Sequence, residues 1–301
     1  MENQQLTKII KGKLTQENKT DQKMTIETLF EAGVHFGHPT RKWNPKMEKF
    51  IFGQRSKTHI IDLEKTLHQL SKASKYVTKI VSNGGKCMFV GTKFQAQACI
   101  KEEAIRSNSM YVSERWLGGM LTNFETIKDR IARLKNLEKT ASDPDNSRLT
   151  KKERQVMSTQ ILKLEKFFGG IKDISEYPDV IFVIDIEKEN IVVKEAEIVG
   201  IPVIALVDTN SDPTQIEIPI PGNDDALRSI KLVTSLISNA VIEGSAIYQK
   251  NKEEEEKDQV KNTTLSNVSS ESKKSDIPTV ESNQKTESKK EESEESISEK
   301  K

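Results

Sequence analysis

Hydrophobic and polar positions follow helix and strand patterns in turn along most of the chain after Asp62. Apolar residues recur at helical spacing in four stretches, at about residues 63–80, 94–107, 190–199 and 223–248. Short continuous apolar runs lie at residues 87–90, 110–112, 180–184 and 203–207. Continuous apolar strands separated by helices are typical of strands that are buried on both faces. The pattern therefore predicts an α/β fold with a parallel sheet flanked by helices.

Residues 123–168 break this alternation, because they carry two helical patterns and no strand. Apolar residues step by three and four along both halves: Phe124, Ile127, Ile131 and Leu134, then Met157, Ile161, Leu164 and Phe168. Thr122-x-x-Glu125 and Thr150-x-x-Glu153 predict a capping box at the start of each helix. Residues 142–145 (SDPD) predict the turn between them. Narrow seams of this kind predict an antiparallel coiled-coil hairpin, about 25 Å long, inserted into the α/β domain.

The two ends of the chain differ from its middle. Residues 1–24 form a polar arm, and Thr25 predicts the N-cap of a short helix ended by Gly33. Residues 34–61 predict an irregular, extended segment. Residues 250–301 have no aromatic side chain and few aliphatic ones, which predicts a disordered charged tail. The α/β domain is thus expected at residues 25–122 and 169–249.

Charge is distributed unevenly along the chain, although the net value is only +1. Residues 1–172 hold 32 Lys and Arg against 18 Asp and Glu, a net of +14. Residues 173–249 hold 4 against 14, and residues 250–301 hold 11 against 14. A basic region of this size attracts nucleic acid or acidic membranes, and an acidic region faces elsewhere or meets a basic protein. The alternative is that the charges are only solvated faces.

No segment indicates a membrane or a secreted protein. No apolar run approaches the ~20 residues that span a bilayer, and the first residues lack the apolar region of a signal peptide. Cys87 and Cys99 are twelve residues apart, which matches neither a zinc site nor a disulfide framework. We expect a cytosolic protein, or one of an organellar matrix if a plastid or mitochondrion encodes it.

Residues 35–47 (HFGHPTRKWNPKM) and 114–123 (ERWLGGMLTN) concentrate Arg, Trp, Asn and Gly, types that make fixed contacts with a polyanion. Together with the outward face of the helical hairpin and one strand-end lysine, they supply these candidate RNA contacts: Arg41, Lys42, Trp43, Asn44, Lys46, Lys93, Arg115, Lys128, Arg130, Arg133, Lys151 and Lys152. The hairpin charges also fit the ordinary outer positions of a coiled coil. Trp43 and Trp116 fit either a stacking role against nucleic acid or anchoring in the core.

The sequence supports a catalytic or metal-binding site less well than it supports RNA binding. Residues 90–93 (VGTK) fit a phosphate-binding turn only loosely, because the glycine and Gly-Lys-Ser/Thr order of a P-loop is missing, and a plain βα turn is the alternative. Asp185 and Asp208 follow two strands, where catalytic or metal-binding groups occur, but turn or N-cap acids are favoured because no complementary catalytic base or nucleophile can be named. His35 and His38 match no zinc-ligand spacing. We therefore expect no cofactor, no metal and no small-molecule substrate.

The motifs of this chain resemble one family, the second protein of the small ribosomal subunit in its bacterial or organellar form. The resemblance covers about residues 25–246, and the matching motifs are EAGVHFGH (31–38), RKWNPKM (41–47), FIFG (50–53), HIIDL (59–63), FVGTK (89–93), RWLGGMLTN (115–123), LTKKE (149–153), GGIK (169–172), PD (178–179), FVID (182–185), EA (195–196), GIPV (200–203), VDTNSDP (207–213) and IPGNDD (220–225).

The resemblance implies a flavodoxin-like parallel sheet with a protruding coiled coil, bound to small-subunit ribosomal RNA. It implies neighbouring small-subunit proteins as partners, a role in docking the large, multi-domain first protein, and no enzymatic activity. The arm before Met24 and the tail after Tyr248 depart from the family. The alternative hypothesis is an α/β enzyme that acts on a phosphorylated ligand between Gly91 and Lys93, with Asp208.

Overall fold

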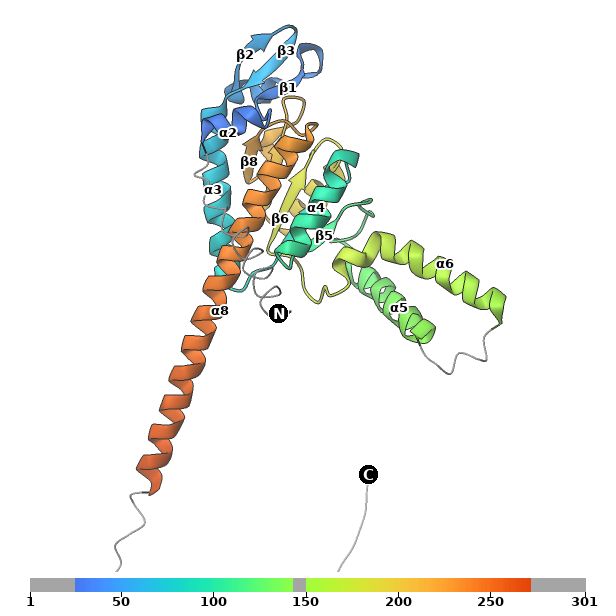
Figure 1. The fold of residues 1–301 in the computed structure, drawn as a ribbon, viewed down its shortest axis with the longest axis vertical. Coiled ribbons are helices and arrows are strands. Elements are labelled where there is room, and N and C mark those ends of the chain that lie inside the picture. The colour runs from blue at the N-terminus through green and yellow to red at the C-terminus, as the bar shows by residue number, and fades with distance from the viewer. Residues whose placement is uncertain (1–24, 143–149, 272–301) are drawn as a thin grey trace, which may run out of the picture. The chain divides into compact units, whose positions relative to one another are not determined.

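The computed structural model describes residues 25–142 and 150–271 (Figure 1). Met1–Asn251 form one compact unit and Lys252–Lys301 a second. The longer helices are α3 (Leu63–Ser82), α4 (Phe94–Arg106), α5 (Phe124–Ser142), α6 (Lys151–Phe168), α7 (Asn190–Val199) and α8 (Leu227–Glu271). The short helix α2 (Ile26–Glu31) and the 3₁₀ turns η1 (Thr40–Lys42), η2 (Pro45–Phe50), η4 (Gly169–Ile171) and η5 (Pro213–Gln215) complete the helical elements.

Five parallel strands form the central sheet in the order β5-β4-β6-β7-β8. They are β4 (Cys87–Val90), β5 (Met110–Val112), β6 (Val180–Ile184), β7 (Val203–Val207) and β8 (Ile218–Pro221). Numbered along the chain this order is 2-1-3-4-5, which is the flavodoxin-like arrangement. The parallel sheet is therefore confirmed. The order reverses between β4 and β6, which places a crevice at the carboxyl ends of these strands.

Strand β8 was missed in the sequence, since its motif, Ile-Pro-Ile-Pro, carries two prolines. Proline cannot donate a backbone hydrogen bond, so it is tolerated mainly on edge strands. In the structure β8 lies at one edge and pairs only with β7. Pro219 and Pro221 are thereby accommodated in a sheet that is otherwise buried.

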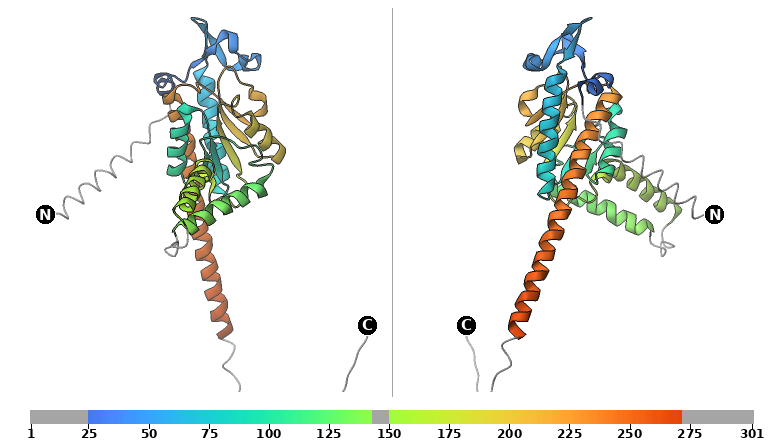
Figure 2. Two further views of the ribbon diagram at one scale, coloured as in Figure 1. Left: turned by 90° about the vertical axis from the view of Figure 1, so that its right-hand side faces the viewer. Right: turned by 60° about the vertical axis from the view of Figure 1, so that its left-hand side comes forward.

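Helices cover both faces of the sheet (Figure 2). Side chains of α3, α4 and α8 pack with Phe89 and Phe182 on one face. Side chains of α5, α6 and α7 pack with Met88 and Ile181 on the other. Neighbouring residues of one strand thus point into different cores, which explains why the strands are apolar without a break.

The prediction of an irregular segment at residues 34–61 is wrong in part. A small antiparallel sheet, ordered β1-β3-β2, occupies it: β1 (Phe36–Pro39), β2 (Ile51–Arg55) and β3 (Thr58–Ile61). The turn between β2 and β3 places Ser56 and Lys57 at positive φ. Two-residue hairpin turns usually contain Asn-Gly or a similar pair. The pair Ser56-Lys57 lacks this signature, so the hairpin was not predicted.

Helices α5 and α6 pack against each other along the predicted seam. Ile127, Ile131 and Leu134 are buried, and Ile161 and Leu164 are half-buried. These two helices lie side by side beyond strand β5 (Figure 1). The seam that periodicity predicted is therefore where the helices meet.

The two predicted capping boxes have different outcomes. Thr150 and Glu153 form a reciprocal box at the start of α6. Thr122 instead donates its hydroxyl to Glu195, so the box predicted with Glu125 is wrong. The turn between the helices was predicted at residues 142–145. Ser142 is the last residue of α5, and residues 143–149 lie outside the described part of the chain.

Helix α8 begins later and ends later than the predicted 223–248. The side chain of Asn223 accepts hydrogen bonds from the backbone of Asp225 and Ala226 just before the helix. The stretch Leu227–Glu254 is long and apolar enough to cross a membrane by length and composition alone, but 44% of its most apolar window is buried inside the protein. We attribute its apolarity to packing on the sheet, through residues such as Ile230 and Ile237.

The helix continues through the first part of the predicted disordered tail, up to Glu271. Residues 272–301, like the polar arm 1–24, lie outside the described residues.

Candidate functional site

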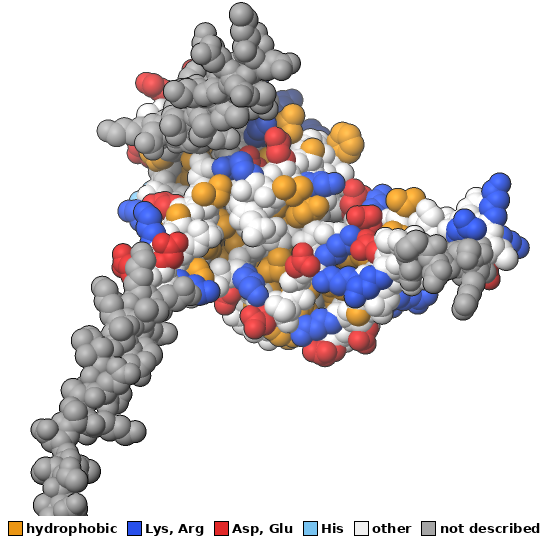
Figure 3. Space-filling view, turned by 60° about the horizontal axis from the view of Figure 1, so that its bottom comes forward, with side chains coloured by type: hydrophobic (Ala, Val, Ile, Leu, Met, Phe, Trp, Pro, Cys, Tyr) orange, Lys and Arg blue, Asp and Glu red, His pale blue; other side chains and the backbone are white. Residues whose placement is uncertain are grey.

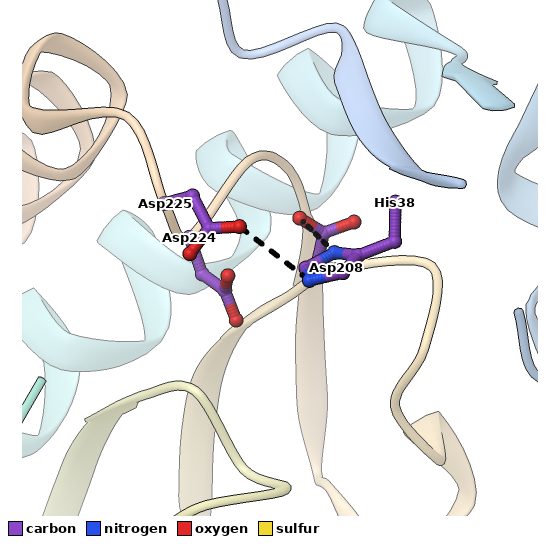
Figure 4. A group of neighbouring side chains, drawn as sticks. All are labelled: His38, Asp208, Asp224 and Asp225. Atoms are coloured by element: carbon purple, nitrogen blue, oxygen red, sulfur yellow. Dashed lines mark ion pairs between the residues drawn. The ribbon is translucent and has the colours of Figure 1, made fainter. Parts of the chain in front are cut away.

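A cluster of charged side chains lies at the carboxyl ends of the parallel strands. Asp208 follows β7, Asp224 and Asp225 follow β8, and Lys93 follows β4. His38 reaches the cluster from β1 of the small sheet (Figure 4). Topology therefore brings together three separate loops and one strand at this edge.

Lys93 is the central cation of this cluster. Its Nζ lies 2.7 Å from Asp224 Oδ1, 2.5 Å from Asp225 Oδ1 and 3.4 Å from Asp185 Oδ2. Burial lowers the pKa of Lys93, but its hydrogen bonds to Asp224 and Asp225 outweigh burial and raise the pKa above its usual range. Lys93 is thus a fully charged internal partner of three carboxylates.

His38 bridges two of the same acids. Its Nδ1 lies 3.0 Å from Asp208 Oδ2, and its Nε2 lies 3.4 Å from Asp225 Oδ2. The hydrogen bond to Asp208 is the main reason that the pKa of His38 is raised. The backbone of His38 also donates to the Thr209 hydroxyl at 2.8 Å, which holds the small sheet to the end of β7.

Asp224 differs from the other acids of the cluster in its complete burial and its raised pKa. Its side chain is fully buried, and Oδ2 has no hydrogen-bond partner among the described residues. Burial, followed by repulsion from Asp208 and Asp185, raises the pKa of Asp224 to about 7. One ligand atom each from His38, Asp208, Asp224 and Asp225 lies within 4.8 Å of the others, so this group could hold a metal ion.

The structure bears on the catalytic and metal-binding roles considered for Asp185, Asp208, His35 and the turn at residues 90–93. Asp185 and Asp208 accept hydrogen bonds from the backbone of Lys188 and Thr209, so both serve as turn acids while they pair with cations. His35 is stacked on Phe30 with ring centroids 4.3 Å apart and takes no part in the cluster. A phosphate at residues 90–93 would face the carboxylates that surround Lys93, which disfavours the enzyme hypothesis.

The loop at residues 113–123 is organised by a buried acid on α7. Glu195 accepts hydrogen bonds from Trp116 Nε1, from the backbone of Gly119, Leu121 and Thr122, and from the Thr122 hydroxyl. Burial raises the pKa of Glu195, but these hydrogen bonds outweigh it and the pKa is lowered. Gly119 has φ +90°, as its place in this tight loop requires.

The two tryptophans have different environments. Trp116 is 6% exposed, and its indole N–H is satisfied by Glu195, so the core interpretation is confirmed for this residue. Trp43 is half-buried, and its ring centroid lies 5.1 Å from that of His59. Arg115, next to Trp116, is exposed and has no ion pair with a described residue.

Of the candidates at residues 41–46, only the first two have free charges. Arg41 and Lys42 are exposed in η1 and form no ion pair with a described residue. Asn44 caps η2 by accepting from the Lys46 backbone. Lys46 pairs with Asp212 at 2.5 Å, which lowers the pKa of that acid to about 2 against the opposing effect of burial.

The candidate RNA contacts on the hairpin all lie at its surface, but they differ in whether an acidic side chain lies near their charge. Lys128 lies near Glu125, at 3.5 Å, and over the ring of Phe124. Arg130, Arg133, Lys151 and Lys152 are exposed and form no ion pair with a described residue. On the face of the molecule drawn in Figure 3, Lys and Arg side chains are interspersed with Asp and Glu.

Sequence reasoning missed three acids that organise these sites: Asp224, Asp225 and Glu195. Asp224 and Asp225 follow the unrecognised strand β8, so their position at a strand end was hidden. Glu195 lies on one face of a helix, and its partners are more than 70 residues away in the sequence. The pair of adjacent acids after an apolar run was the one available signal.

The fold places the chain among α/β proteins with a parallel five-stranded sheet flanked by helices. Residues 29–244 match the family described as Ribosomal protein S2, and the chain belongs to this family. It is 52% identical over 223 residues to the small ribosomal subunit protein uS2 of Fusobacterium nucleatum, a match that covers 74% of this chain and 90% of the relative. The chain is a structural, non-enzymatic constituent of the small ribosomal subunit.

Proposed function

We propose that the chain binds small-subunit ribosomal RNA through two exposed basic surfaces and helps to dock the large, multi-domain first protein of the subunit. The first surface comprises Arg41, Lys42 and Arg115, and the second is the hairpin of α5 and α6, which we propose to be an inserted coiled coil. Lys93 and Lys46 have acidic partners inside the protein, so we assign them structural roles.

The observation that carries the RNA proposal is the free charge of these surfaces. Seven of their cations are exposed without an ion pair to a described residue, within a segment whose net charge is +14: Arg41, Lys42, Arg115, Arg130, Arg133, Lys151 and Lys152. Phosphate groups are the natural partners of such cations, since neutralising them releases counterions. Buried Trp116 and Glu195 hold the loop of Arg115 in place.

The docking proposal concerns the acidic region of the chain. Residues 173–249 have 4 Lys and Arg against 14 Asp and Glu, and such a region repels RNA but attracts a basic protein surface. Assembly into small subunits would place the protein in the bacterial cytoplasm, or in an organellar matrix if an organelle encodes it.

Co-sedimentation with small subunits depleted of this protein tests the RNA proposal. The logarithm of affinity should fall linearly with the logarithm of salt concentration, by about 0.7 to 0.9 per phosphate contact. Replacing Arg41 and Lys42 by Gln should reduce this slope, whereas replacing Lys46, which is already paired, should leave it nearly unchanged. An affinity that does not depend on salt would contradict the proposal.

A further inference from the structure

A groove runs along one face of the helical hairpin. Two adjoining hollows, of about 550 and 500 Å³, share Thr126, Arg130, Lys163 and Leu164 in their lining. Their volumes fall in the range of about 300–1,000 Å³ that protein pockets for small organic groups occupy. The groove begins at the hairpin base, beside Gly118 and Gly119, and continues between α5 and α6.

The lining of this groove includes apolar side chains from both helices. Ile127 and Phe168 are buried, while Leu164 and Phe167 are half-buried and line the opening. A Cβ atom added to Gly118 would meet nothing within 4 Å, so the base of the groove is open on that side. An apolar surface of this kind offers contact to a flat, weakly polar group.

Cations line the rim. Arg130, Arg133 and Lys163 are exposed and form no ion pair with a described residue, and Asp129 is the one acid among the described residues that line the groove. Elsewhere on the hairpin some lysines are paired with acids, whereas others, such as Lys151 and Lys152, form no ion pair with a described residue. Lys135 pairs with Asp173 at 3.2 Å, and Lys166 pairs with Glu114 at 3.1 Å.

The combination of unpaired cations with an apolar lining distinguishes the groove from an ordinary coiled-coil surface. Outer positions of coiled coils usually alternate in sign and pair with each other. Here Lys135 and Lys166 are paired and lie outside the groove, whereas the three cations that line it form no ion pair with a described residue. The groove is therefore complementary to a polyanion that also carries flat groups.

We propose that this groove binds an unpaired stretch of RNA, with phosphates on Arg130, Arg133 and Lys163 and one base or ribose on Leu164 and Phe167. The inference rests on the proposed function and deepens it by assigning a site and a strand type. Unpaired RNA fits better than a duplex, because the faces of paired bases are covered by stacking inside an A-form helix, whereas unstacked bases pack on apolar and aromatic side chains. Arginine also matches phosphate with paired donors.

Salt-dependent binding of the full chain to small-subunit ribosomal RNA tests this site. We compare Arg130→Gln/Arg133→Gln on α5 with Lys135→Gln/Lys166→Gln, which removes the same charge from the hairpin but from paired positions on α5 and α6. The groove variant should weaken binding on the order of tenfold and reduce the salt slope by about 1.4, while the control keeps the wild-type slope. Ultraviolet cross-linking of the wild-type complex should join a base to residues 160–168.

Each other outcome has a distinct meaning. If the wild-type protein binds no ribosomal RNA at any salt concentration, the proposed function fails. If it binds RNA and the two double variants have equal slopes, or cross-links lie only outside α5 and α6, the groove inference fails and the proposed function stands. If the groove variant binds RNA normally but loses an acidic protein of the subunit, the occupant is a protein and the inference is wrong.

Discussion

The carboxylate of Glu195 on α7 accepts a hydrogen bond from the backbone N–H of Gly119 at 2.7 Å, although 76 residues separate them in the chain. The same carboxylate binds Trp116, Leu121 and Thr122, so one buried acid fixes the loop that leads into the hairpin. A buried charge needs such a set of donors to be stable. Glu195 therefore couples the α/β domain to its insertion.

Replacing Glu195 by Gln should destabilise the protein by about 3 kcal/mol, because hydrogen bonds to a charged group are strong and the amide N–H₂ would face backbone donors. Urea unfolding measures this change. Glu197→Gln on the same helix is the matched control, since Glu197 is exposed, and it should alter stability by less than about 0.5 kcal/mol. Equal stability of the two variants would show that the donors find water instead.

Arg115 and Trp116 are neighbours with opposite expected effects. Trp116→Ala should cost about 3–5 kcal/mol of stability, because the side chain is buried and its indole N–H is bonded. Arg115→Ala should leave the melting temperature nearly unchanged, since the side chain is exposed, and should weaken incorporation into small subunits. Thermal unfolding and co-sedimentation measure the two effects. Normal incorporation of a folded Arg115→Ala variant would remove Arg115 from the RNA surface.

Periodicity was enough to predict the buried strands and the seam of the hairpin. Phe89 and Met88 face different cores, and this two-sided burial leaves an apolar run that is readable without any partner strand. Strand β8 and the small sheet were not readable. Pro219 interrupts the first, and the Ser56-Lys57 turn of the second lacks a turn-forming glycine.

The sites were harder to predict than the fold, because long-range hydrogen bonds decide them. Lys93 was predicted as an RNA contact, but in the structure it pairs with acids that include Asp224, which follows β8 more than 130 residues later. Thr122 had the sequence signature of a cap and is used by Glu195. A local signature is thus overridden when a buried charge from another element needs the same donor.

Removing residues 255–301 should leave the free energy of unfolding within about 1 kcal/mol of that of the full chain. Where burial in α8 is described, Val241 is the last buried large side chain and Gly244 the last buried residue, and the compact first unit ends at Asn251. Urea unfolding measures the effect, and a truncation after residue 239, which removes Ala240 and Val241, is the contrasting control. A large loss for the first truncation would mean that the tail stabilises the domain.

The strand-end cluster predicts an unusual pH dependence. The raised pKa values of His38 and Asp224 mean that both groups bind a proton more tightly in the folded protein than in the unfolded chain. Their contributions to stability are complete below the unfolded pKa values, 3.8 for Asp224 and 6.5 for His38. They are lost as pH rises, through about 7 for Asp224 and through the raised pKa for His38.

In the presence of a chelator, Asp224→Asn should therefore flatten the dependence of unfolding free energy on pH between about 4 and 7. Asp212→Asn is the control, because the pKa of Asp212 is lowered to about 2 and its titration lies below this window. Equal slopes for both variants would show that Asp224 is not the source.

A divalent cation held by His38, Asp208, Asp224 and Asp225 would require their deprotonated forms. Stabilisation by added metal should then grow as pH rises in the wild-type protein and be reduced in Asp224→Asn, in melting experiments with and without the ion.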